Sequence, residues 1–300
     1  MAVNLLERLE QLQVVAITGK GGVGKTTVTA ALGARLAARG RQVLLLEVDP
    51  RENLHQLLGI RPSGGHILKA GPRLHLQHLD PRGVLDDLVR DKLKVGALVR
   101  RVLSSPIHQQ FTEGAPGLKE TAVFGRALRL VDGFTPRGVP TPDVVLLDAP
   151  ATGHGISWLT APQLIAEVIE TGPVGHMAAQ IAAFMADSER FGVVVVATAE
   201  EMPIQESLEL LAGLRDRVGR DAEGVVVNAL YPQAPGDLDA ADAAAALWLK
   251  RRLLNERELG RLREHWHGPL LELPLLPVDP GPPLVTALGQ ELESAARTGG

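Results

Sequence analysis

The sequence predicts a doubly wound α/β fold, in which helices cover both faces of a mostly parallel sheet and a helical subdomain is added to it. Two observations lead to this prediction. Short apolar runs rich in β-branched residues recur along the chain, and continuous apolar character is typical of strands buried on both faces. Helical patterns fill most of the intervals between these runs. A length of 300 residues suits one large core, so we expect a single domain over residues 1–300.

Seven segments are expected to form strands. In chain order they are residues 14–18, 43–48, 74–79, 144–147, 193–198, 225–227 and 270–273, of which 74–79 and 270–273 have the weaker patterns. Two of the intervening helices have a clear end, because glycine readily takes the left-handed conformation that closes a helix. Residues 26–38 are followed by Gly40, and residues 204–218 are followed by Gly219.

Two stretches interrupt this alternation and predict helical additions at one edge of the sheet. The first, at about residues 80–134, lies in a mostly helical interval between two expected strands. The second, at about residues 158–190, is helical on both sides of Gly172-Pro173, a pair that interrupts a helix.

Composition and charge exclude several classes of function. The chain carries 31 Lys and Arg against 35 Asp and Glu, which gives a net charge of −4, and it has only five Phe, three Trp and one Tyr to stack on bases. Broad nucleic-acid binding is therefore disfavoured. The absence of cysteine excludes disulfides, zinc–thiolate sites, iron–sulfur clusters and thiol nucleophiles.

The N-terminal residues and the hydropathy of the chain bear on its location. The N-terminal segment carries charges at Glu7, Arg8 and Glu10 and lacks the apolar stretch of a secretory signal. No run of about 18 apolar residues occurs, so no membrane-spanning helix is expected. We therefore expect a soluble, cytoplasmic protein.

A glycine-rich loop follows the first expected strand and opens the next helix. It reads Gly19-Lys20-Gly21-Gly22-Val23-Gly24-Lys25-Thr26-Thr27, which satisfies the phosphate-loop pattern in the structural context where that pattern is meaningful. Glycines let successive backbone N–H groups curl around a phosphate, and the helix N-terminus adds the positive end of its dipole. Lys25 is expected to reach the β- and γ-phosphates, and the Thr26 hydroxyl is expected to bind Mg²⁺. The sequence thus predicts an ATPase that uses ATP and Mg²⁺, with residues 21–27 holding the nucleotide.

Acidic residues end two of the expected strands, and the carboxyl ends of parallel strands are where such folds bind their ligands. Asp148 follows residues 144–147 and fits the role of a Mg²⁺ ligand that acts through water. Asp49 follows residues 43–48 and is free to orient the attacking water. The alternative for either aspartate is a turn cap, a role in which aspartate is common.

Lys20 occupies a position that the general phosphate-loop pattern leaves free. With it, the loop resembles the deviant Walker A loop of the family that includes MinD, ParA, the nitrogenase iron protein, the ArsA arsenite-pump ATPases and the tail-anchored-protein-targeting ATPases. The resemblance implies a dimer of identical chains or of paralogues, in which Lys20 acts in catalysis by contacting the partner's nucleotide. The alternative is a solvated surface lysine.

Further motifs resemble the ArsA-like branch of that family. They are Asp49-Pro50-Arg51-Glu52-Asn53-Leu54 (switch I), Asp148-Ala149-Pro150-Ala151-Thr152-Gly153-His154 (switch II), Ala115-Pro116-Gly117-Leu118-Lys119-Glu120 and Glu200-Glu201-Met202-Pro203-Ile204-Gln205-Glu206-Ser207. The resemblance also implies that Asn228 reads the adenine base and that Pro274 and Leu275 line the base from the other side. It spans nearly the whole chain, from residue 13 to about residue 296.

The chain also departs from the pattern of this branch. Switch I has Arg51-Glu52 in place of Ala-His, and switch II continues as Gly155-Ile156-Ser157 in place of Thr-Leu-Arg. The absence of cysteine leaves no metalloid site of the arsenite-pump type, no zinc clamp of the eukaryotic targeting type and no cluster ligands of the nitrogenase type. Arsenite pumping and electron transfer are therefore excluded.

The resemblance implies that ATP hydrolysis resets a dimeric switch, which captures and releases a hydrophobic client or engages a membrane partner. The expected client surface is an apolar side of the helical additions, made of Leu85, Leu88, Leu93, Leu98, Val99, Val102, Leu103, Ile165, Ile169, Met177, Ile181, Phe184 and Met185. Packing into the core is the alternative for these residues. Two other functions stay open: a ParA- or MinD-like positioning ATPase that uses DNA or membrane as its matrix, and a regulatory protein that binds ATP with negligible turnover.

Overall fold

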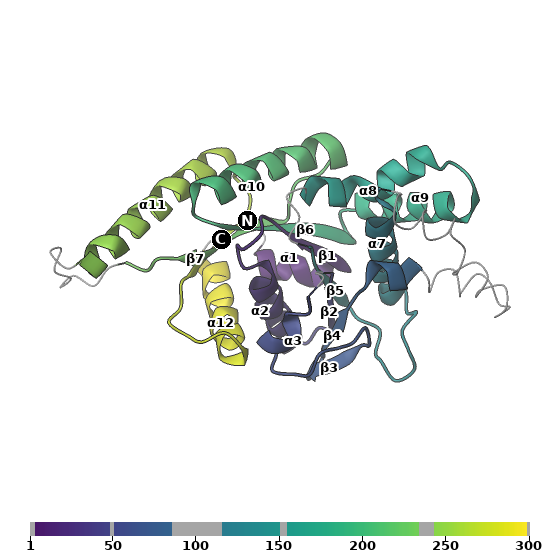
Figure 1. Ribbon diagram of the computed structural model, residues 1–300, viewed down its shortest axis with the longest axis horizontal. Coiled ribbons are helices and arrows are strands. Elements are labelled where there is room, and N and C mark those ends of the chain that lie inside the picture. The colour runs from purple at the N-terminus through teal and green to yellow at the C-terminus, as the bar shows by residue number, and fades with distance from the viewer. Residues whose placement is uncertain (1–3, 49–50, 86–115, 151–154, 234–242, 299–300) are drawn as a thin grey trace.

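A computed structural model describes residues 4–48, 51–85, 116–150, 155–233 and 243–298 of the chain. Their strands form one eight-stranded sheet in the order β3-β4-β2-β5-β1-β6-β7-β8 (Figure 1). The strands are β1 Val14–Thr18, β2 Val43–Glu47, β3 Leu68–Gly71, β4 Leu74–His78, β5 Val144–Asp148, β6 Phe191–Thr198, β7 Gly224–Leu230 and β8 Leu270–Pro274. Every neighbouring pair is parallel except β3 and β4, which are antiparallel. The doubly wound α/β prediction is therefore confirmed.

All seven expected strands are present, and the strand that the sequence did not predict is β3. This strand has only four residues, Leu68–Gly71, and none of them is fully buried. It lies at the edge of the sheet, where one side of the strand has no neighbour, so its sequence does not need the apolar run of the central strands. Edge strands of this kind leave little signal in hydropathy.

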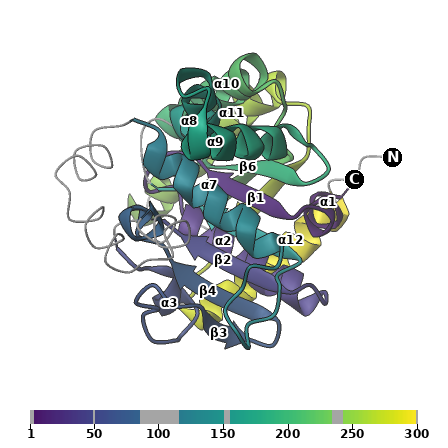
Figure 2. The ribbon, with the colours of Figure 1, turned by 90° about the vertical axis from the view of Figure 1, so that its right-hand side faces the viewer.

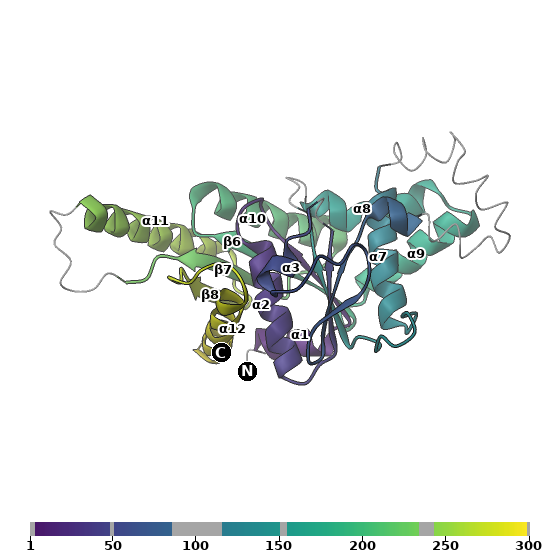
Figure 3. The ribbon, with the colours of Figure 1, turned by 60° about the horizontal axis from the view of Figure 1, so that its bottom comes forward.

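Two helical layers cover the two faces of the sheet (Figures 2 and 3). One layer contains α1 Leu5–Gln11, α2 Lys25–Ala38, α3 Leu54–Leu57 and α12 Pro282–Thr298, and the other contains α7 Leu118–Val131, α8 Gly155–Val168, α9 Gly172–Ala186, α10 Glu201–Gly213 and α11 Ala243–His265. Alternate residues of one strand enter opposite cores: in β5, Val145 and Leu147 join one cluster, whereas Val144 and Leu146 join the other. This explains why the strands read as continuous apolar runs.

The helix ends agree with the glycine signals. Gly40, just after α2, has a φ of +99°. Gly219 has a φ of +73° and ends the π-helical turn Leu214–Val218, which directly follows α10. Gly172 begins α9 after the break that follows α8. The second helical addition starts at Gly155, three residues earlier than expected. In the first addition α7 is described, and residues 86–115 lie outside the described residues.

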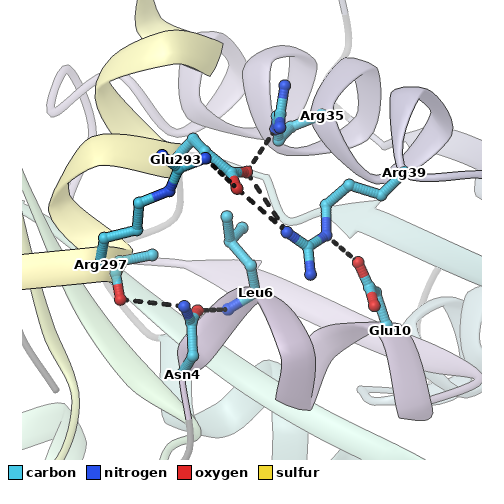
Figure 4. Close-up of polar contacts among 8 residues, drawn as sticks. Asn4, Leu6, Glu10, Arg35, Arg39, Glu293 and Arg297 are labelled. Atoms are coloured by element: carbon cyan, nitrogen blue, oxygen red, sulfur yellow. Dashed lines mark hydrogen bonds and ion pairs between the residues drawn. The ribbon is translucent and has the colours of Figure 1, made fainter.

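The helix α2 is held against α1 and α12 by a group of polar contacts on its outer side (Figure 4). Arg35 donates from Nε to Oε2 of Glu293 on α12 at 2.6 Å. Arg39 pairs with Glu10 of α1 and also donates from Nη1 to Oε1 of Glu293 at 3.2 Å. Asn4 Nδ2 donates to the Ala296 carbonyl oxygen at 2.9 Å, which ties the two ends of the described chain together. The first and last helices thus brace the helix that follows the glycine-rich loop.

The helix α11 runs beyond the edge of the sheet (Figures 1 and 3). Its N-terminal half leaves Leu247 and Leu253 exposed, while Asn255 and Leu259 of its C-terminal half are buried. Among the described residues, no helix combines the length and the apolar character that crossing a bilayer requires.

Candidate functional site

The glycine-rich loop connects β1 to α2 at the carboxyl edge of the sheet, and its backbone depends on glycine at both ends. Gly19 has a φ of +145°, and a Cβ atom there would lie 2.1 Å from the carbonyl oxygen of Val196. Gly24, which caps α2, has a φ of +89°, and its Cβ would lie 2.3 Å from Nδ2 of Asn228. Any side chain at these positions would push the loop away from β6 and β7.

Lys25 is the first residue of α2 and is almost completely buried. Its Nζ donates to the carbonyl oxygens of Gly19 and Lys20, both at 3.0 Å. The ammonium group therefore lies across the start of the loop, which places a positive charge where a loop of this type holds a phosphate.

The predicted magnesium ligands Thr26 and Asp148 lie together. Oγ1 of Thr26 donates to Oδ2 of Asp148 at 2.7 Å, and Oγ1 of Thr29, one turn further along α2, donates to Oδ1 at 3.2 Å. Asp148 is buried at the end of β5. A hydroxyl at the end of a phosphate loop and a carboxylate at the end of the neighbouring strand are the hard oxygen donors that Mg²⁺ prefers, so this pair fits the ion.

A second carboxylate, Glu47, lies next to Asp148 and does not stand out in the sequence except as an acid within an apolar run. The register of β2 and β5 sets Glu47 opposite Asp148. Glu47 is completely buried; its Oε1 accepts the N–H groups of Asn53 at 2.6 Å and Leu54 at 3.1 Å, and its Oε2 has no hydrogen-bond partner among the described residues. Burial raises the pKa of Glu47 to about 7; the two hydrogen bonds oppose this shift and the Asp148 carboxylate adds to it.

Lys20 forms an ion pair within its own chain. Its Nζ lies 2.6 Å from Oε1 of Glu206, which belongs to α10, and both side chains are about one third exposed. The role across a subunit interface that the resemblance implies for Lys20 stays a prediction. The pairing with Glu206 was not foreseen from the sequence, because it joins residues 186 positions apart.

The residues expected to bind the adenine base lie at the same edge of the sheet. Asn228, near the end of β7, donates from Nδ2 to the carbonyl oxygen of Val23 in the loop at 3.0 Å. The next residue, Ala229, has a φ of +57°, and the pairing of β7 with β8 shifts register there. Leu275, 38% exposed, donates its N–H to the carbonyl oxygen of Leu230 at 2.7 Å, and Pro274 pairs with Leu230 in the sheet. The structure thus brings Asn228 to the loop and Pro274-Leu275 to the end of β7.

Parts of both switch motifs lie outside the described residues. These parts are Asp49 and Pro50 of switch I and residues 151–154 of switch II, so the catalytic role of Asp49 stays a prediction. The described end of switch I is anchored by its unusual Glu52, whose carboxylate accepts the N–H groups of Ser63 at 2.6 Å and Gly64 at 3.0 Å. Arg51 is exposed.

A cavity of about 930 Å³ lies beside the starts of the two switches. It is bounded by Val48 and Pro150, next to the ends of β2 and β5, and by Trp158 and Leu164 of α8 and Val123 of α7. Its lining is mainly apolar, with charged groups at Asp80, Arg82, Lys119 and Glu120. The cavity therefore connects the carboxyl edge of the sheet to the helical addition.

The expected client surface is partly core. Leu85, Ile181, Phe184 and Met185 belong to the hydrophobic core, and Ile165 is buried, so packing explains these five. Ile169 and Met177 are half-buried. Leu88, Leu93, Leu98, Val99, Val102 and Leu103 lie outside the described residues.

Comparison with known proteins matches residues 12–181 to the family model of the anion-transporting ATPases, ArsA_ATPase. The ATPase BagA of Mycobacterium tuberculosis is 29% identical over 255 residues, which cover 80% of this chain and 74% of that protein. An arsenical pump-driving ATPase of Escherichia coli is 30% identical over 257 residues, 77% of this chain and 41% of the relative. The ATPase GET3 of Malassezia globosa is 27% identical over 168 residues, 55% of this chain and 47% of the relative.

Proposed function

This chain belongs to the ArsA family of anion-transporting ATPases, and from this premise we propose that it is a Mg²⁺-dependent dimeric switch whose hydrolysis of ATP drives capture and release of a hydrophobic client or a membrane partner. ATPase activity follows from the family itself. Turnover by a dimer and the client are the parts that we propose.

The observation that carries the proposal is the contact between Thr26 and Asp148 under a phosphate loop. The carboxylate accepts the threonine hydroxyl at 2.7 Å, so the two oxygen donors lie together at one point of the site. Bound Mg²⁺ would supply positive charge to the β- and γ-phosphate oxygens. Lys25, whose ammonium group is held by the Gly19 and Lys20 carbonyl oxygens, supplies a second positive charge.

The reaction needs little from the protein beyond position and charge. Asp49 orients a water so that its oxygen attacks the γ-phosphorus while the bond to the oxygen bridging the β- and γ-phosphates breaks. The products are ADP and inorganic phosphate. Asn228 and Leu275 hold the base end, which keeps the γ-phosphate in register with Lys25.

The cavity beside the switches supports a hydrophobic client. Because Val48 and Pro150 adjoin the two switch motifs and also bound this apolar cavity, a change at the γ-phosphate is transmitted to the cavity wall over a few residues. A thiolate metalloid site is excluded, since the chain has no cysteine. An apolar cavity of this size fits a segment of a hydrophobic helix better than an anion.

Two variants of α8 test this proposal. Leu164 lines the cavity and is 52% exposed, whereas Val168, one turn further on, is 80% exposed and does not line it. A fluorescent peptide with one hydrophobic helix should be kept soluble by Asp49→Asn protein in ATP and Mg²⁺. Adding Leu164→Glu should abolish this capture, while adding Val168→Glu should leave it unchanged.

Other outcomes contradict the client proposal. Equal capture by both glutamate variants would show that the cavity is not the client site. Failure of the Asp49→Asn protein to hold the peptide would contradict a hydrophobic client altogether. ATP-dependent binding to DNA or to lipid vesicles in place of the peptide would favour a positioning ATPase.

A further inference from the structure

We propose that Glu47 is a positioning residue for hydrolysis: its buried carboxylate closes the segment of switch I that carries Asp49 by accepting the backbone N–H groups of Asn53 and Leu54. This inference rests on the proposed function, because it takes Asp49 as the residue that orients the attacking water. Glu47 lies within the apolar strand β2 and is not one of the motif residues to which the family resemblance assigns a role.

The Glu47 carboxylate joins the end of β2 to the start of α3. Glu47 is the last residue of β2, and Asn53 and Leu54 begin α3. Asn53 caps this helix, but its own side chain makes no capping hydrogen bond. Instead, Oε1 of Glu47 accepts the N–H groups of Asn53 at 2.6 Å and of Leu54 at 3.1 Å. The end of β2 and the start of α3 are therefore joined through one carboxylate.

Glu52 forms a separate anchor for the described end of switch I. Glu52 accepts the N–H groups of Ser63 and Gly64 at 2.6 and 3.0 Å, and its Oε1 lies 3.7 Å from Nδ1 of His78 at the end of β4. Two carboxylates thus hold the described end of switch I: Glu47 at the end of β2 accepts N–H groups of switch I, and Glu52 within switch I accepts N–H groups of the loop before β3. Glu52 is one of the two residues by which switch I departs from the family pattern.

Burial of the Glu47 carboxyl group has a cost in folding stability. Glu47 is completely buried, and one of its oxygens has no hydrogen-bond partner among the described residues. Such a carboxyl group destabilises the fold, so its presence indicates that another requirement keeps it there. A neutral side chain at the end of a strand would avoid this cost. Its hydrogen bonds point to the requirement: Glu47 fixes the start of α3 to the end of β2, opposite the proposed magnesium ligand Asp148 in the register of β2 and β5.

The test compares three substitutions in the full chain. Glu47→Ala removes both acceptor oxygens, Glu47→Gln keeps a carbonyl oxygen at the position of Oε1, and Glu52→Gln keeps one acceptor oxygen in the outer anchor. We expect Glu47→Ala to lower kcat about tenfold or more, because a small displacement of a positioned group has a large effect on rate. The Kd for a fluorescent ATP analogue should change less than about threefold, since Lys25 and the loop are untouched.

The conservative variants decide whether the hydrogen bonds are responsible. Glu47→Gln should keep kcat within about threefold of the parent protein, because one carbonyl oxygen can still accept both N–H groups, whereas Glu52→Gln loses one of its two acceptor oxygens and should be slower than Glu47→Gln. If Glu47→Ala does not fold, as judged by circular dichroism and Tm, Glu47→Gln compared with Glu47→Leu at a lower temperature carries the same test. A Glu47→Gln protein as slow as Glu47→Ala would overturn the inference.

A double-mutant cycle separates the inference from the function on which it rests. In the Asp49→Asn background, Glu47→Ala should lower turnover no further, because the residue that it positions is already gone. Independent, multiplicative losses would overturn the inference. Full activity of Asp49→Asn alone would overturn the proposed function, whereas an inactive Asp49→Asn protein with a fully active Glu47→Ala protein would overturn only the inference.

Discussion

At the scale of single residues, the site combines buried charges that no local pattern would place together. Lys25, Asp148 and Glu47 are all more than nine-tenths buried, and each is stabilised by a different device: two loop carbonyls, two threonine hydroxyls and two backbone N–H groups. Burying charged groups destabilises a fold unless they are hydrogen-bonded, so their concentration at one edge of the sheet is typical of a functional site.

Lys20 is the residue whose role is most sharply testable at this scale. Its ion pair with Glu206 is partly exposed and contributes less than about 1 kcal/mol to stability, so Lys20→Ala should leave Tm nearly unchanged. If Lys20 contacts the partner's nucleotide, the variant should hydrolyse ATP slowly and regain part of its activity when mixed with Asp49→Asn subunits. Steady-state phosphate release from such mixtures measures this.

Glu206→Gln is the matched control for Lys20. It weakens the pair within the chain but keeps the lysine, so turnover should persist. Equal losses in Lys20→Ala and Glu206→Gln, with no recovery on mixing, would show that the pair itself matters and that the role across an interface is wrong.

At the scale of elements, the phosphate-loop helix α2 is fixed at both ends. Its N-terminus depends on Gly24 and the contact of Asn228 with Val23, and its C-terminal half is tied to α1 and α12 through Arg35, Arg39 and Glu293 (Figure 4). The site geometry is therefore supported by the two terminal helices, which contribute no motif, and α12 lies far from the loop in sequence.

Glu293 gives a prediction of pH dependence. The hydrogen bond from Arg35, with further attraction from Arg35 and Arg39, holds the pKa of Glu293 below its usual value. Its contribution to stability is present above the ordinary glutamate pKa and is lost as pH falls through the lower folded-state pKa. Glu293→Gln should lower the free energy of unfolding by about 1 kcal/mol at pH 7, and the difference from the parent should shrink in acid.

Urea unfolding between neutral and acid pH measures this difference. Glu291→Gln, on the same helix, is the control, because within the described part of the chain Glu291 has no ion pair. A difference between Glu293→Gln and the parent that stays constant with pH would contradict the assignment.

At the scale of the whole molecule, one sheet carries the nucleotide loop at its carboxyl edge, and the helical addition that bounds the cavity meets the same edge. β1, which leads into the loop, lies between β5 and β6, so the glycine-rich loop is central in the sheet and close to β2 and β5, the strands that precede the two switch motifs. The predictions of an ArsA-like ATPase and of a doubly wound fold are confirmed by the family and by this topology. The dimer and the division of the chain into domains stay predictions.

Self-association can be tested with the same variants. If nucleotide is held between two subunits, Asp49→Asn protein in ATP and Mg²⁺ should have twice the 32.0 kDa mass of one chain, measured by light scattering. Lys25→Ala should remain at the mass of one chain under the same conditions, because it loses the contact to the phosphates. Asp49→Asn protein that binds ATP but stays monomeric would contradict the dimeric switch.

The sequence by itself determined the strand segments, the α2 helix and its glycine-rich loop, and it singled out Thr26 and Asp148 as candidate ligands, because buried parallel strands and phosphate loops are specified by local runs of residue types. The tertiary structure decided which distant residues meet. Strand register set Glu47 beside Asp148, the packing of α10 brought Glu206 to Lys20, and the edge position of β3 hid it from hydropathy. These features depend on contacts between segments far apart in the chain, and no periodicity within a segment encodes its neighbour's register.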